Sequence, residues 1–217
     1  MKQLITGVFI FISSLGISQI QYTTQKGQFE LGVRNTYSVF SANHGIGEGV
    51  GGQFRIGVSE KINTEWFADY IISNISDLGK RADMHIGWSV MFYPFEFESR
   101  FKPYVLAGHC FDYTKVNAFK SPYTNIITET QDRWSSAVQM GIGTHFTLSK
   151  RTNLSLSAQY MMHLGTDLHA HAENVNGLDE LVIETHAGEG IEGHLLLNLS
   201  LNVLVANFGK KKENEAH

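Results

Sequence analysis

Apolar and polar residues alternate over long segments of this chain, and this pattern restricts its fold more than any other feature. In the segment 152–163, apolar residues occupy the even positions, and the odd positions are polar apart from Met161. Alternation with a period of two predicts a β-strand with one apolar face and one polar face. The segment is about twice as long as an ordinary strand and close to the ~9–11 residues that a tilted strand needs to cross a bilayer.

The same alternation predicts eight strands, an even number, as a closed antiparallel barrel in a membrane requires. They cover residues 29–39, 50–58, 62–73, 84–92, 103–114, 134–148, 152–163 and 195–205. The phase of the segment 103–114 is left open. We therefore expect an all-β fold, an eight-stranded antiparallel up-and-down transmembrane β-barrel.

The lengths of the connections between these segments alternate. The first, third, fifth and seventh connections are at residues 41–49, 74–80, 116–132 and 165–190, and the others at 59–61, 94–102 and 149–151. The first two long connections are modest, and the turn 94–102 is longer than ideal. Membrane barrels of this kind keep short turns on the periplasmic side and long loops outside. Aromatic residues at the predicted strand ends indicate two interfacial girdles. These are Phe29, Phe92, Tyr104 and Phe146 toward the periplasm, and Tyr37, Trp134 and Tyr160 toward the outside.

The N-terminus has the features of a secretory signal peptide. Lys2 gives a positive start, an apolar run begins at Leu4, and small residues at Gly16 and Ser18 fit the peptidase site. The apolar run is shorter than the ~20 residues that a transmembrane helix needs. We expect a signal peptide over residues 1–18, a barrel over 19–208 and a polar tail over 209–217.

The composition excludes several other classes of protein. A single cysteine, Cys110, excludes an internal disulfide framework. The formal net charge is −4 and the Lys and Arg residues are scattered, so we expect no nucleic-acid partner. No later stretch approaches 18 consecutive apolar residues, which excludes a transmembrane helix after the signal peptide.

A soluble β-sandwich or lipocalin-like barrel is the competing architecture, because it would also alternate. The polar faces here are rich in Gly, Ser, Asn and Gln and poor in Lys, which suits a crowded lumen better than a solvated surface. An eight-stranded barrel is just wide enough for its own side chains, so we expect no large pore. Because confined charges need partners, we predict an ion-pair network of Arg34 and Arg55 with Glu30, Glu65 and Asp69.

Two segments, 102–108 (KPYVLAG) and 141–149 (GIGTHFTLS), carry a resemblance to a known group. With the signal peptide and the eight-strand layout, the chain resembles the small outer-membrane β-barrel proteins of the OmpA-type and porin-family group. The resemblance implies a monomer in the bacterial outer membrane that contacts lipids and lipopolysaccharide, is inserted by the barrel assembly machinery and has room for an extracellular ligand. Such barrels often end on an aromatic residue, whereas here Phe208 precedes a polar tail.

Histidine is the one residue type whose abundance suggests a chemical role. Half of the ten histidines lie in the last long loop or beside it. In an extended segment His169 and His171 lie on one side, so they could chelate zinc or copper, with Glu173 as an oxygen ligand. Solvated loop residues are the alternative interpretation. By phase, His85 and His145 face the lumen, where we expect hydrogen-bonded, space-filling side chains.

Some small outer-membrane barrels act on lipid A with a His, a Ser and a carboxylate. His163 is followed by Leu164–Asp167, which holds no Ser, so the nucleophile of such an enzyme is missing. His163 itself faces the lumen by phase. We expect a non-enzymatic barrel without a cofactor, with a structural or surface-binding role mediated by the outer loops 116–132 and 165–190. A lipid-A-modifying hydrolase and a metal-binding barrel are the alternatives.

Overall fold

The computed structural model describes residues 25–40, 46–95, 100–121, 123–165, 167–175, 178–186 and 193–209. In these ranges the chain forms strands joined by turns and bends, and no helix is long and apolar enough to cross a membrane. The predicted signal peptide (1–18) lies outside the described residues, as does the predicted tail (209–217) apart from Gly209.

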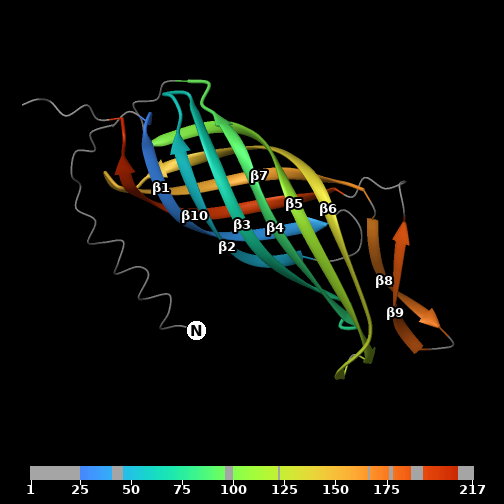
Figure 1. The fold of residues 1–217 in the computed structure, drawn as a ribbon. Helices are drawn as coiled ribbons and strands as arrows, with labels where there is room; N and C mark the ends of the chain where they lie inside the picture. Colours follow the sequence, from blue (N-terminus) through green and yellow to red (C-terminus); the bar gives the residue numbers. More distant parts are fainter. Residues whose placement is uncertain are drawn as a thin grey trace, which may run out of the picture.

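Eight of the ten strands close into one barrel, in which every neighbouring pair is antiparallel (Figure 1). The strands are β1 (Gln28–Phe40), β2 (Ile46–Gly57), β3 (Ile62–Ile75), β4 (Gly79–Phe92), β5 (Phe101–Ser121), β6 (Thr124–Thr147), β7 (Thr152–Leu164), β8 (Asp167–Val175), β9 (Leu178–His186) and β10 (Gly193–Asn207). Each barrel strand pairs with the next barrel strand along the chain, and β10 closes onto β1. The predicted up-and-down barrel is confirmed.

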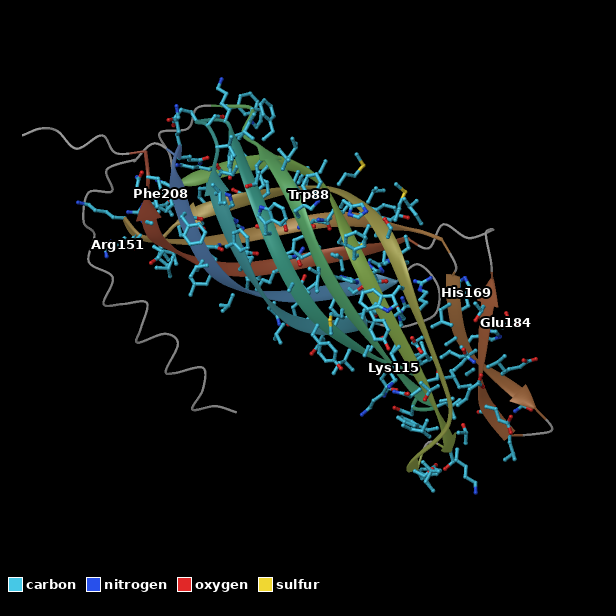
Figure 2. All side chains as sticks on the ribbon, viewed as in Figure 1. Trp88, Lys115, Arg151, His169, Glu184 and Phe208 are labelled. Carbon is cyan, nitrogen blue, oxygen red and sulfur yellow. The ribbon has the colours of Figure 1, made fainter. Side chains whose placement is uncertain are left out.

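Successive residues of the barrel strands point alternately into the lumen and outward. In β4, Asp83 and His85 are buried inside the barrel, whereas Met84, Ile86 and Trp88 are exposed on its outer wall (Figure 2). The outward positions of all eight strands carry exposed aliphatic and aromatic side chains. An apolar surface of this extent fits the hydrocarbon core of a bilayer, where a closed barrel satisfies all of its backbone hydrogen bonds.

Strand β5 resolves the segment whose phase the sequence left open. Its even-numbered residues face the lumen, among them Cys110 and Asp112. The assignment of Tyr104 to the periplasmic girdle is wrong, because this residue also faces inward. Its ring centre lies 4.5 Å from that of His145 and 5.8 Å from that of Tyr93. Tyr104 therefore belongs to the packing of the lumen.

Two segments that the sequence analysis treats as loops contain strands. Pairing of β5 with β6 continues past the barrel rim as far as Ser121 and Thr124, so most of the segment 116–132 is a protruding hairpin. The segment 165–190 contains β8 and β9, which pair from Asp167↔His186 to Val175↔Leu178. The loop interpretation of both segments is wrong, since the ladders continue beyond the part that spans the membrane.

The hairpin of β8 and β9 packs against the protruding part of β5 and against the adjoining end of β3 (Figure 1). The buried apolar cluster between them contains Ile75, Leu78, Val116, Ala118, Leu168, Ala170 and Leu181, with Ile183 packed against it. We call residues 115–133 and 167–186 together the outer head. The outer head lies at the end of the barrel opposite the start of β1 and the end of β10, and a small apolar core joins it to Ile75 and Leu78 at the end of β3.

The predicted ion-pair network is confirmed in the lumen. Glu65 contacts two arginines, with 2.7 Å between its Oε2 and Arg55 Nε and 3.4 Å between its Oε1 and Arg34 Nη1. Arg34 Nε lies 3.0 Å from Asp69 Oδ1, and Arg55 Nη1 lies 3.9 Å from Glu30 Oε2. All of these side chains except Glu30 are almost fully buried, so each charge depends on its partners. Glu65 is the link between the two arginines.

We predict that Leu156→Arg lowers the free energy of unfolding by about 2–4 kcal/mol, the cost of a cation near the middle of the lipid-facing wall. Leu156 is 56% exposed and points outward from β7. Urea titration of barrels folded into lipid vesicles measures the effect. Gln131→Arg in the outer head is the matched control and should change stability by less than about 0.5 kcal/mol. An unchanged stability of Leu156→Arg would contradict the lipid-facing phase of β7.

We predict that Glu65→Ala costs about 3–5 kcal/mol, because it leaves two buried guanidinium groups without their shared carboxylate. The same urea titration measures this loss. Glu129→Ala removes an exposed carboxylate in the outer head and should have little effect. A loss of less than about 1 kcal/mol for Glu65→Ala, the value of a surface pair, would show that the lumen compensates the arginines in another way.

Candidate functional site

A cluster of apolar side chains lies in the lumen and partly separates an inner polar compartment from an outer one. It consists of Phe67, Ile71, Cys110, Ala137, Met161 and Leu196, and we call it the septum. The guanidinium carbon of Arg34 lies 4.5 Å from the centre of the Phe67 ring, so the ion-pair network borders the septum directly. Gly87 makes room for it, because a Cβ at this position would collide with Phe67 and Cys110. Asp69 lies between Phe67 and Ile71 on β3 and pairs across the sheet with His85, so the septum covers only part of the polar lining of the barrel.

The inner compartment, on the side of the termini, is closely hydrogen-bonded. His145 Nε2 lies 2.8 Å from the Tyr93 hydroxyl, and its Nδ1 lies 2.7 Å from Ser155 Oγ. Asn63 Nδ2 donates to the Tyr93 hydroxyl at 3.0 Å. The expectation that His145 is a hydrogen-bonded, space-filling residue is confirmed.

The outer compartment, below the outer head, holds three buried imidazoles around one carboxylate. His85 Nε2 lies 3.2 Å from Asp112 Oδ1, and His163 Nδ1 lies 3.1 Å from Asp112 Oδ2. The ring of His194 stacks on His85, with 5.7 Å between the ring centres, and meets His163 edge to face, with 4.8 Å between the centres. His85 and His163 therefore face the lumen as predicted. The sequence analysis missed Asp112 as their partner because the phase of β5 was open.

A serine does lie beside His163, although it comes from another strand. Ser135 Oγ of β6 lies 3.2 Å from His163 Nδ1 and donates to Asp112 Oδ2 at 3.3 Å. The inference that His163 has no serine neighbour is therefore wrong: none follows it directly in the sequence, but the fold places one beside it. In a Ser-His-Asp hydrolase, however, the serine and the carboxylate bind different ring nitrogens. Here both approach Nδ1, and all three residues are buried in the lumen. The arrangement does not have the geometry of a hydrolytic triad.

The predicted metal ligands lie on β8 in the outer head. His169, His171 and Glu173 alternate with Leu168 and Ala170, which are buried in the apolar cluster. The three candidates therefore share the opposite face of the hairpin, with Glu184 across from His169 and Glu180 across from Glu173. Within the described ranges, no three or more His, Cys, Asp or Glu side chains are arranged so that they could hold a metal ion.

No protein-family model matches this chain, and no curated protein matches it. A major outer membrane protein from Thermus thermophilus is 9% identical, with a TM-score of 0.54 over 81% of this chain and 98% of its own. The N-terminal β-barrel domain of Pseudomonas aeruginosa OprF is 9% identical, with a TM-score of 0.48 over 82% and 98%. The outer membrane protein OprG from the same organism as OprF is 13% identical, with a TM-score of 0.46 over 83% and 98%.

At such low identities the likeness to the Thermus protein concerns the fold alone. The apolar belt adds a physical reason for the same conclusion. A closed, even-stranded barrel with lipid-facing apolar side chains and a polar interior is the structure with which proteins span outer membranes. This chain is an integral β-barrel protein of the bacterial outer membrane.

Proposed function

We propose that this protein binds an extracellular partner through its outer head, and that the barrel serves as the anchor. The observation that carries the proposal is the packing of the hairpin β8–β9 on the protruding part of β5 and on the end of β3. Long outer connections could remain irregular in such a barrel. Here they form strands with a buried apolar cluster, which holds a surface in a fixed shape outside the membrane.

The tips of the outer head expose residues of the kind that anchor protein interfaces. Tyr123 is 96% exposed at the turn between β5 and β6, and Ile126 and Ile127 follow it on β6. Leu178 is exposed at the start of β9. Exposed aromatic and aliphatic side chains grouped beyond the membrane-spanning wall are typical of binding surfaces.

The lumen supports an anchoring role better than a transport role. The septum fills part of it with apolar side chains, and the ion-pair network of Arg34, Arg55 and Glu65 occupies the space beside the septum. An eight-stranded barrel has no further room once such side chains occupy it. The grouping of Ser135, His163 and Asp112 does not favour a lipid-A-modifying hydrolase, because it is enclosed and lacks the geometry of a triad.

We predict that a variant with residues 167–186 replaced by a short Gly-Ser linker loses binding to the extracellular ligand by about tenfold or more. Intact cells that display the wild type or the variant are tested against a panel of purified lipopolysaccharides, glycans and extracellular-matrix proteins. The triple variant Tyr123→Ser/Ile126→Ser/Ile127→Ser keeps both hairpins and tests the tip alone. A shift in gel mobility on boiling confirms that each barrel is folded.

Three results would contradict the proposed function. The first is a panel ligand that binds the wild type and both variants equally, which would place its site on another part of the surface. The second is altered acylation of lipid A in cells that overproduce the protein, which would reveal a hydrolase. The third is a series of porin-sized current steps from the wild type in planar bilayers, which would show a channel.

A second candidate function, metal binding by the hairpin β8–β9, is favoured by the shared face of His169, His171 and Glu173. Because the side chains of the described residues are not arranged to hold an ion, binding requires His169, His171 and Glu173 to change their side-chain conformations. With that change, we expect calorimetric titration with zinc or copper to show about one ion per chain, since two imidazoles and a carboxylate suit either metal. The double variant His169→Ala/His171→Ala should abolish the binding, whereas Glu129→Ala should not. Absence of binding by the wild type, or equal binding by the double variant, would remove this function.

A further inference from the structure

A polar cavity of about 70 Å³ opens into the barrel at the end that holds both termini. We call it the inner vestibule. The residues that line it include Glu30, Lys102, Ser149, Lys150 and Arg151. The cavity has room for about five water molecules at ~10–15 Å³ each. It lies on the periplasmic side if the short turns face the periplasm, as in other barrels of this kind.

The charge of the inner vestibule is predominantly positive. Lys102, Lys150 and Arg151 contribute three cationic groups to its lining, against one carboxylate, that of Glu30. This carboxylate already accepts a hydrogen bond from Asn153 Nδ2 at 2.8 Å and lies 3.9 Å from Arg55 Nη1, deeper in the lumen. Glu30 is therefore shared between Arg55 and Lys102, and Lys102 also interacts electrostatically with Glu60. The cationic groups at the entrance still outnumber the carboxylates, which makes the potential in this confined polar space positive.

Hydroxyl groups add neutral donors on the same side of the cavity. Thr147, Ser149 and Thr152 line it around the turn between β6 and β7. This turn is held by the Ser149 amide, which donates to the Thr152 carbonyl at 3.1 Å, and by the Arg151 amide, which donates to Ser149 Oγ at 3.2 Å. Because Ser149 Oγ accepts in this contact, its own O–H can donate to a ligand.

We propose that the inner vestibule binds a phosphate group that reaches it from the periplasmic side. A tetrahedral anion accepts hydrogen bonds in several directions, which matches ammonium, guanidinium and hydroxyl donors spread over one wall of a small cavity. The amide oxygens Gln25 Oε1 and Asn63 Oδ1 are buried and lack a protein partner, and water beside the phosphate would donate to them. A free phosphate ion and the headgroup of an anionic phospholipid of the inner leaflet share this chemistry.

The barrel offers a matched control, because Arg151 and Lys115 lie at opposite ends of the molecule (Figure 2). The full barrel in neutral detergent is titrated with inorganic phosphate by calorimetry at constant ionic strength. Lys102→Met and Arg151→Gln should each weaken binding by about tenfold, the effect of losing one hydrogen bond to a charged group. Lys115→Met removes a cation from the same strand as Lys102, in the outer head, and should leave the dissociation constant unchanged.

Two outcomes support the site and identify the source of the phosphate. If short-chain phosphatidylglycerol competes with inorganic phosphate, the ligand is a lipid headgroup; if it does not compete, the ligand is a free phosphate. Arg151 is exposed on a turn, so Arg151→Gln tests the site even if Lys102→Met fails to fold. Absence of phosphate binding by the wild type, or the same dissociation constant in all folded variants, would overturn the proposal.

Discussion

The ladder between β1 and β10 is the interaction on which the rest of the structure depends. It runs from Gln28↔Asn207 to Phe40↔His194 and joins the two ends of the sheet. Without it, two strand edges would place unpaired N–H and C=O groups in hydrocarbon. Each unpaired group would cost several kcal/mol of free energy. Closure also fixes which side chains share the interior. Between these two paired strands, Arg34 of β1 donates to Asn198 Oδ1 of β10 at 2.9 Å. This polar contact inside the barrel therefore exists only when the sheet is closed.

The barrel and the charged part of its interior could be predicted from the sequence because a strand has a period of two. Once one face of a strand is assigned to lipid, every polar residue on the other face must lie inside. Arg34, Arg55 and Glu65 could therefore be paired before any contact was known, since charges in a narrow lumen need partners. The same reasoning failed for β5 and for Met161. Both contribute apolar side chains to the interior. Where the inward and outward faces of a strand are both apolar, the sequence does not show which face points to the lumen.

The candidate sites were harder to predict, because they join residues from strands that are distant in sequence. Ser135 contacts His163 through the register of β6 with β7, and Asp112 reaches both from β5. No local motif encodes such a register. The outer strands were missed for a different reason. Polar segments rich in Thr and charged residues have the composition of loops. Their pairing can be recognised only once the partner strand and the apolar cluster of the outer head are known.

The position of Glu65 between two arginines has a consequence for how this sequence can change over time. A neutral residue at position 65 leaves two buried cations, and loss of either arginine leaves part of a buried carboxylate without a partner. Single substitutions at these positions are therefore selected against even where a combined replacement by uncharged residues would be tolerated. Among homologous sequences, positions 34, 55 and 65 should be inherited as a unit. That unit links the neighbouring strands β1, β2 and β3.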